Sequence, residues 1–210
     1  RWMGRLIRGR LGTPQAFLGK ISDVQDEMIR EQDLREKASV DGLTGALNRK
    51  AAEQKINTLM QDKDCKGYLL MLDIDDFKTV NDTMGHAAGD DALRQIAERM
   101  KDIESPILTP YRFAGDEFIM ILNTDDREIL EQIAKGIYEK INSTQGFQRQ
   151  IENYLGHAIT TTEKSRITCS IGIASAGDVR KEEDINELIR SADEILYKVK
   201  TGEKGHYAFL

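Results

Sequence analysis

The chain has 210 residues, of which 40% are hydrophobic and 31% are charged, and its formal net charge is −6. This length suits one good-sized domain plus an appendage, and the composition is ordinary for a soluble globular protein. The negative balance argues against a general nucleic-acid-binding or anionic-membrane surface, although it leaves room for a local basic pocket that holds a nucleotide.

The first 24 residues read as a β-hairpin. Trp2 to Arg8 and Phe17 to Val24 are strand-like, and Leu11 to Pro14 supplies the turn. An isolated hairpin is marginal in water, and the chain begins at Arg1 rather than Met, so we expect a fragment whose preceding domain is missing. The Trp-bearing strand, the Gly-Xaa-Pro turn and the segment Gly19 to Val24 resemble the last two strands of a PAS sensor domain.

Residues 25–40 are charged and helical in character, and a sparse apolar stripe at near-heptad spacing includes Met28 and Leu34. A solvated helix is one interpretation. We favour the other, a signalling coiled coil between a sensor and an output domain. Asp41 to Gly45 then breaks the helix, and Asn48 can cap the next helix, which runs to about Met60. The predicted domains are therefore a hairpin over 1–24, a linker over 25–40 and a globular domain over 41–210.

Hydrophobic periodicity predicts the elements of the globular domain. The predicted strands are 68–74, the hairpin 108–122, 167–174 and 207–210; the predicted helices are 77–84, about 88–103, 127–141 and 183–200. The third of these helices carries Ile129, Ile133, Ile137 and Ile141 as its apolar stripe. Residues 142–166 are polar and read as a long loop or partial helix. The element order indicates an α+β sandwich with helices over a mostly antiparallel sheet.

Two carboxylates are placed to share a cation. Asp73 ends an apolar strand, and Asp116 follows the small residues Ala114 and Gly115 in the hairpin turn. If the hairpin pairs beside the strand, both carboxylates meet at one sheet edge, where they repel each other unless Mg²⁺ or Mn²⁺ lies between them. The plain alternative is that these acids end strands and face solvent. The further acids Asp75, Asp76 and Glu117 weigh against that alternative.

Other residues nearby suit a nucleotide. Lys78 follows the acids, and Lys200 and Lys204 lie at the end of the last helix, where a lysine also suits the helix dipole. Asn81 and Asp90 can together read the edge of a purine, because a carboxylate accepts from the N1–H and N2–H₂ groups of guanine. His86 has no Ser or Cys nucleophile beside it, so we interpret it as structural.

These residues lie in motifs that resemble the GGDEF family, the diguanylate cyclases. The matching segments are Asp73 to Asp82 with Gly85 to Asp90, Arg112 to Phe118, Asp41 to Arg49, Ser170 to Ala174, and Ala192 to Tyr197. Five motifs in the family's order cover residues 41–210. The resemblance implies a nucleotide-cyclase palm with a ferredoxin-like core and a central five-stranded sheet. It also implies condensation of two GTP into cyclic di-GMP with release of two pyrophosphates.

The resemblance implies roles residue by residue. Asp73, Asp116 and the Ile74 carbonyl match the ligands of two Mg²⁺ or Mn²⁺ ions per active site, and Glu117 lies close by as a further candidate catalytic residue. The substrate positions are Asn81 and Asp90 for guanine, Leu93 for an apolar contact to the base, Asp76 and Phe77 for phosphate through their amides, Lys78, Lys200 and Lys204 for phosphate through their charge, and Ala114 and Gly115 against the substrate. Lys204 stands where the family commonly has Arg, so a bidentate contact is lost.

Two departures from the family matter. Ala114 replaces the first glycine of the signature, and we expect GTP to fit if the backbone there has φ below zero. Ser105 and Leu108 replace the Arg and Asp of the family's inhibitory product site, so we expect no feedback inhibition through that site.

Each domain would hold one GTP, so turnover requires a homodimer, downstream of a sensor domain. The alternatives are a catalytically silent GTP-binding module that regulates a partner, for which Ala114 is the main argument, and a cyclic di-GMP receptor. We expect no nucleic-acid partner and no membrane contact from this fragment, since no apolar run approaches the ~20 residues of a span. Cys65 and Cys169 read as reduced thiols of a cytoplasmic protein, which leaves membrane anchoring of the parent open.

Overall fold

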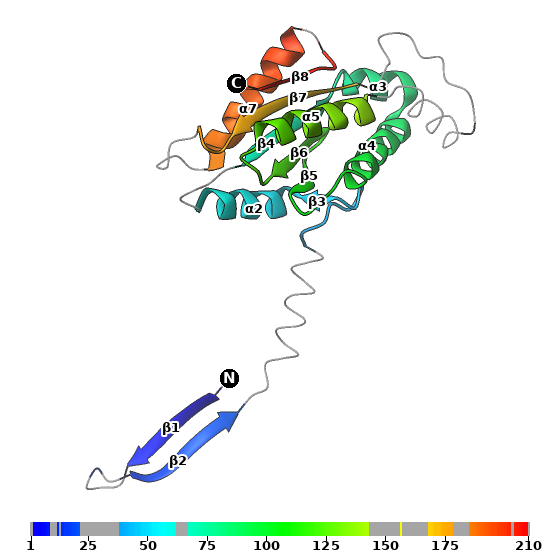
Figure 1. The fold of residues 1–210 in the computed structure, drawn as a ribbon. Helices are drawn as coiled ribbons and strands as arrows, with labels where there is room; N and C mark the ends of the chain where they lie inside the picture. The colour runs from blue at the N-terminus through cyan, green and yellow to red at the C-terminus, as the bar shows by residue number, and fades with distance from the viewer. Residues whose placement is uncertain are drawn as a thin grey trace. The chain divides into compact units, whose positions relative to one another are not determined.

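The structure is a computed structural model. It describes residues 2–8, 12, 14–21, 38–61, 67–142, 156, 168–178, 185–202 and 204–209. The chain divides into two compact units, Arg1–Ala38 and Ser39–Leu210 (Figure 1).

The first unit contains an antiparallel pair of strands, β1 (Trp2–Arg8) and β2 (Pro14–Ile21), with Gly4 opposite Gly19. The pair agrees with the predicted hairpin, but β2 begins earlier than the predicted Phe17. Residues 22–37 lie outside the described ranges, and most of the predicted helical linker falls there. The likeness to a PAS domain stays a prediction.

A six-stranded mixed sheet forms the centre of the second unit, in the order β3-β5-β6-β4-β7-β8. The four middle strands are β5 (Leu108–Ala114), β6 (Glu117–Leu122), β4 (Tyr68–Ile74) and β7 (Cys169–Ser175), and neighbouring members run antiparallel. The edge strands β3 (Leu47–Asn48) and β8 (Tyr207–Phe209) are parallel to their neighbours. The α+β class and the helix-flanked sheet are thus confirmed, with one short edge strand more than the five expected.

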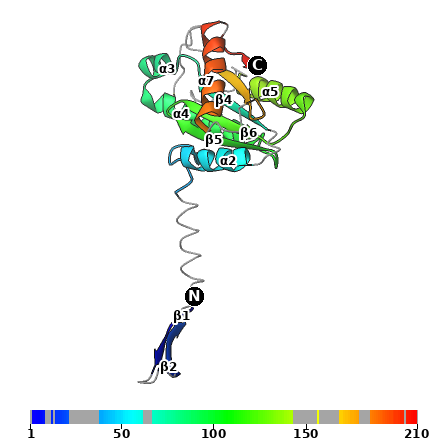
Figure 2. The same cartoon turned by 90° about the vertical axis from the view of Figure 1, so that its left-hand side faces the viewer.

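Among the described residues of this unit there are five helices, four of which cover the two faces of the sheet (Figures 1 and 2). The five are α2 (Arg49–Gln61), α3 (Phe77–Met84), α4 (His86–Lys101), α5 (Arg127–Ile141) and α7 (Ile185–Thr201), of which α3 packs against α4. On one face, α4 and α5 pack over Leu70 and Leu72 of β4; on the other, α2 and α7 pack over Leu69 and Met71. Because β4 is buried on both faces, its sequence is a continuous apolar run rather than an alternating one.

The buried face of α5 differs in part from the predicted apolar stripe. In α5 the buried residues are Leu130, Ala134, Ile137 and Ile141, so the first half of the predicted stripe is displaced by one residue.

Gly172 of β7 lets α7 approach closely, because a Cβ there would lie 2.3 Å from the Ala192 carbonyl oxygen. This contact brings the C-terminal end of α7 toward the end of β4. Within the described ranges no helix combines the length and the hydrophobicity needed to cross a membrane.

Candidate active site

The end of β4 brings Asp73 beside the signature hairpin. In the antiparallel ladders Asp73 lies opposite Glu117 of β6 and opposite Ser170 of β7. Directly opposed residues in a ladder project from the same face of the sheet, so the carboxylates of Asp73 and Glu117 are neighbours. Asp116 comes one residue earlier, in the turn that joins β5 to β6. The sequence pointed to Asp116 as the partner of Asp73, whereas the direct cross-strand neighbour is Glu117.

The Asp73 carboxylate is largely buried and pairs with Lys200 of α7. Its Oδ1 atom lies 2.5 Å from the Lys200 Nζ atom, and the Asp73 side chain is 14% exposed. Burial raises the pKa of Asp73 to about 6; Lys200 opposes this rise, while the charges of Asp116 and Glu117 add to it. Burial and then the Asp116 charge also raise the pKa of Glu117. The three acids therefore form one cluster of like charges that a cation would stabilise.

The donors of this cluster fit a divalent ion that also binds the substrate. Asp73 Oδ1 is buried and its contact is with the Lys200 ammonium group, so this oxygen already faces a cationic partner. Over those same residues, no group of three or more His, Cys, Asp or Glu side chains has the arrangement of a complete metal site. Mg²⁺ typically binds through one or two carboxylates and fills its other positions with water and phosphate oxygens. The residues present fit that kind of site rather than a closed protein cage.

Asp75 has a structural role that its sequence position alone does not reveal. Its carboxylate is 3% exposed and accepts hydrogen bonds from Thr168 Oγ1 and Ser170 Oγ, both at 2.7 Å. Ser170 Oγ in turn accepts from the Gly205 amide at 3.1 Å. These bonds tie the end of β4 to the start of β7 and to the loop before β8. Asp75 therefore shapes the site and is not one of its ligands.

Asp76 pairs with the second lysine. Lys204 Nζ lies 2.8 Å from Asp76 Oδ1 and 2.9 Å from Asp76 Oδ2. Both side chains are about half exposed, 47% for Lys204 and 50% for Asp76. Lys200 and Lys204, two of the lysines that the family resemblance assigns to phosphate, thus lie at the end of β4, each beside a carboxylate. Lys78 is exposed on α3, and Phe77 is half-buried at the start of that helix.

The α3–α4 helix pair carries the candidate guanine-reading residues Asn81 and Asp90. Gly85, with φ of 85°, joins the two helices, a conformation that favours glycine. Asn81 of α3 lies against Gly89 of α4, because a Cβ on Gly89 would lie 2.0 Å from Asn81 Oδ1. Asp90 follows Gly89 and is exposed, whereas Leu93 is 3% exposed within the core. Asn81 therefore lies beside the residue that precedes Asp90, and their joint contact with a base stays a prediction.

The signature turn carries Ala114 and Gly115 at the surface. Gly115 has φ of 40°, and a Cβ there would meet nothing within 4 Å, so the requirement for glycine is conformational. Among the described residues other than glycine, Asp76 alone has a positive φ. Ala114 therefore meets the condition on φ that its substitution for glycine imposes.

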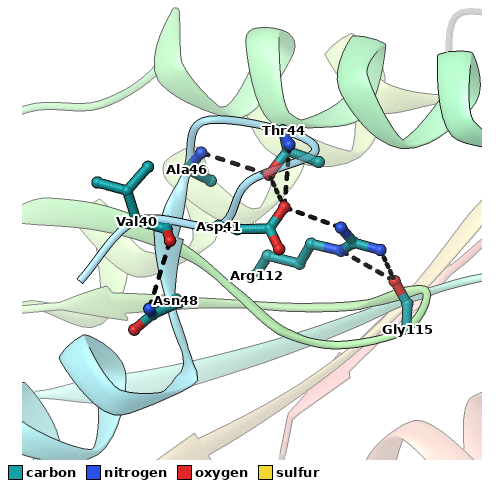
Figure 3. Close-up of polar contacts among 7 residues, drawn as sticks. All are labelled: Val40, Asp41, Thr44, Ala46, Asn48, Arg112 and Gly115. Atoms are coloured by element: carbon teal, nitrogen blue, oxygen red, sulfur yellow. Dashed lines mark hydrogen bonds and ion pairs between the residues drawn. The ribbon is translucent and has the colours of Figure 1, made fainter. Parts of the chain in front are cut away.

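Arg112 connects this turn to the start of the unit (Figure 3). Its Nε and Nη2 atoms donate to the Gly115 carbonyl oxygen at 3.0 and 2.8 Å, and Nη1 donates to Asp41 Oδ1 at 2.8 Å. The same Asp41 oxygen accepts from the amide and the hydroxyl of Thr44 at 2.9 and 2.7 Å. Burial of Asp41 is outweighed by the hydrogen bonds from Arg112 and Thr44, which lower its pKa. The sequence motifs include both Arg112 and Asp41, but they did not predict this contact between the two residues.

Two further observations bear on the predicted site. A pocket of about 510 Å³ is lined by Asp73, Asp193, Glu194, Leu196, Tyr197, Lys198 and Lys200. It includes one candidate metal ligand and one candidate phosphate ligand, but neither Asn81 nor Asp90.

Ser105 and Leu108 exchange both backbone hydrogen bonds at 3.0 Å, and Leu108 is 1% exposed. Neither side chain carries a charge, and the absence of feedback inhibition through this position stays a prediction.

Comparison with known proteins gives a consistent likeness. Residues 38–206 match the family model described as "Diguanylate cyclase, GGDEF domain". The chain is 34% identical over 191 residues to diguanylate cyclase DgcN of Escherichia coli K12, which covers 88% of this chain and 43% of that protein. It is 28% identical over 187 residues to cyclic di-GMP phosphodiesterase PdeR of the same organism, with 89% and 26% covered. The chain thus spans less than half the length of these relatives.

A solved structure agrees with the fold. The coiled coil and GGDEF domain of DgcB from Caulobacter crescentus, in complex with c-di-GMP, is 26% identical to this chain. The two superpose with a TM-score of 0.68, over 89% of this chain and 94% of the other.

Proposed function

This chain belongs to the GGDEF family of diguanylate cyclase domains, and from that premise we propose that residues 39–210 condense two GTP molecules into cyclic di-GMP. The observation that carries the proposal is the buried Asp73 carboxylate, which lies among Asp116, Glu117 and Lys200. Such a cluster suits a triphosphate and its divalent ions, because the phosphates need cations and the acids hold them.

The proposed reaction balances as two identical transfers. The 3′-hydroxyl oxygen of one GTP forms a bond to the α-phosphorus of the other, the bond to the β-phosphate breaks, pyrophosphate leaves and the hydroxyl proton is lost. The second transfer closes the ring, so two GTP give one cyclic di-GMP and two pyrophosphates. Each domain holds one GTP, so two copies of the domain must face each other, which makes a homodimer the competent state.

We assign roles within this reaction to the residues of this chain. Asp73, Asp116 and the Ile74 carbonyl would hold two Mg²⁺ or Mn²⁺ ions, with Glu117 beside them. A bound divalent ion lowers the pKa of the attacking hydroxyl and neutralises charge on the leaving pyrophosphate. The remaining substrate contacts are Asn81 and Asp90 to guanine with Leu93 against the base, the Asp76 and Phe77 amides and the Lys78, Lys200 and Lys204 ammonium groups to phosphate, and Ala114 and Gly115 against the nucleotide.

The choice of GTP over ATP rests on Asp90 and Asn81. A carboxylate accepts hydrogen bonds from the N1–H and the exocyclic amine of guanine, whereas adenine presents no N1–H. A site built around such a pair rejects the wrong base strongly, because its polar groups are then left unpaired. We also propose that the reaction takes place in the cytoplasm and that a sensor domain upstream controls it. The buried free thiol of Cys169 is compatible with a reducing compartment.

The direct test is incubation of the purified full chain with GTP and Mg²⁺, followed by measurement of pyrophosphate and cyclic di-GMP. We expect both products in a ratio of two to one, and neither from ATP. Asp116→Asn should abolish turnover, while Asp102→Asn, which removes the same charge outside the site, should leave it unchanged. A silent regulatory module would bind GTP and release no pyrophosphate, and a receptor would bind cyclic di-GMP without forming it. Either result would overturn the proposal.

A further inference from the structure

Two of the three lysines proposed for the triphosphate, Lys200 and Lys204, are engaged by carboxylates of the same chain. Lys200 Nζ lies 2.5 Å from Asp73, and Lys204 Nζ lies between the two oxygens of Asp76, at 2.8 and 2.9 Å. Asp73 is itself a proposed metal ligand, so a bound cation would give it another partner and release Lys200. Asp76 has no such replacement. Substrate would therefore meet Lys204 with its charge already paired.

A side chain at the N-cap of a helix usually accepts a hydrogen bond from the first backbone amides of that helix, but the side chain of Asp76 does not. Asp76 is the N-cap of α3, with φ of 52° and ψ of 32°, and its side chain makes no cap hydrogen bond. Its carbonyl oxygen instead accepts from the amides of Thr79 and Val80 at 2.7 and 3.2 Å. A left-handed conformation is unfavourable for an L-residue and is best tolerated by Asn, Asp and Gly. The carboxylate is therefore free of the helix and available to Lys204.

We propose that Asp76 determines the affinity of this site for GTP by acting as an internal competitor of the triphosphate for Lys204. This inference rests on the function proposed above. Phosphate oxygens can reach the full charge of Lys204 only by displacing the Asp76 carboxylate. Because the pair is about half exposed and such pairs are weak, Asp76 lowers affinity without blocking the site.

The test is the substitution Asp76→Asn in the full chain. Asparagine has the same shape, tolerates the left-handed backbone and keeps the backbone amide proposed to meet phosphate. The measurement is binding of a non-hydrolysable GTP analogue with Mg²⁺ by calorimetry. We expect Asp76→Asn to bind about fivefold more tightly than the wild type. Asp102→Asn is the matched control: it breaks another exposed pair, Lys140–Asp102 at 3.1 Å, and should leave affinity unchanged.

A second background tests whether the effect passes through Lys204. In Lys204→Ala, which alone should weaken binding, adding Asp76→Asn should give little further change. Equal gains in both backgrounds would overturn the inference, since repulsion alone would then explain them. Equal or weaker binding by the single Asp76→Asn variant would also overturn it, because Asp76 would then orient Lys204 for substrate. A wild type that binds no GTP analogue would contradict the proposed function as well. If the wild type forms cyclic di-GMP and Asp76→Asn still does not bind more tightly, only this inference fails.

Discussion

Three acids within four positions at the end of β4 have three different environments. Asp73 has a raised pKa of about 6, against an ordinary value of 3.8. Between these values the folded chain binds more protons than the unfolded chain, so stability falls as pH rises through this window. Asp75 is satisfied by two hydroxyl groups, and Asp76 pairs with Lys204 at the surface. The sequence shows only three aspartates, whereas the structure shows that they differ in burial and in partners and therefore in role.

At the same scale, Arg112 determines the geometry of the signature turn. Its side chain is 14% exposed and donates hydrogen bonds to both Asp41 and Gly115, so it connects the loop before β3 to the turn (Figure 3). Arg112→Lys keeps the charge but loses the planar set of donors. We expect about 2 kcal/mol lower free energy of unfolding and about tenfold lower turnover. Chemical denaturation and the initial rate of pyrophosphate release measure these two quantities.

The control for that variant is Arg190→Lys, which alters an exposed pair with Glu187 on α7. Exposed pairs of this kind contribute little, so stability and turnover should both stay near the wild-type values. If Arg112→Lys lost stability but kept full turnover per folded molecule, Arg112 would support the fold without positioning the turn.

At the scale of elements, local pattern predicted most of the second unit. β4, α3 and α5 begin and end at the predicted residues, because each is bounded by turn or capping residues that the sequence displays. β3 was missed because two residues carry no periodicity, and it forms through pairing with residues distant in sequence, Tyr111 and Arg112 of β5. The start of the α5 stripe was misplaced because Leu130, rather than Ile129, faces the sheet. Tertiary packing decides such choices between adjacent apolar residues.

The contact between α3 and α4 gives a prediction at this scale. Gly89→Ala should displace Asn81, because the new Cβ would lie 2.0 Å from Asn81 Oδ1, the mobile end of a side chain. We expect a KM for GTP about tenfold higher, as one base-reading hydrogen bond is lost, with the fold retained. Steady-state kinetics with GTP check this. Gly136→Ala in α5 is the control, because a Cβ there meets nothing within 4 Å. It should leave KM unchanged and add up to about 1 kcal/mol of stability.

If Gly89→Ala instead left KM unchanged and lowered only the thermal midpoint, Asn81 would not contact the substrate. That result would leave guanine recognition to Asp90 and would weaken the assignment of the pair.

At the scale of the whole molecule, local motifs nominate candidate site residues but do not predict the contacts among them. Family motifs identified Asp73, Asn81, Asp90 and Lys200 as candidates because each has a fixed place in a local segment. The Asp41–Arg112 and Asp76–Lys204 contacts join residues 71 and 128 positions apart, and neither pair shows a complementary local pattern. Such contacts depend on how strands order within the sheet and how α7 approaches β7. Only the folded structure supplies that information.

Assembly is the property of the whole molecule on which the proposed reaction depends. If each domain contributes one GTP, the active species is a dimer, and its population follows mass action. Well below the dimer dissociation constant, the total rate should rise with the square of the chain concentration; well above it, the rise should be linear. A dilution series of the full chain, assayed by pyrophosphate release, measures this. A linear dependence at every concentration would contradict the requirement for two domains.

The predicted linker can be tested in the same series. Residues 25–37 lie outside the described ranges, so the coiled coil stays a prediction from the apolar stripe that contains Leu34. If that stripe holds two chains together, Leu34→Pro removes a helical hydrogen bond and kinks the helix, and the quadratic region should extend to higher concentration. The rate per chain at high concentration should recover. Arg35→Ala changes the neighbouring position off the stripe and should not shift the curve. An unshifted curve for Leu34→Pro, with the quadratic region intact, would assign dimerisation to residues 39–210 instead.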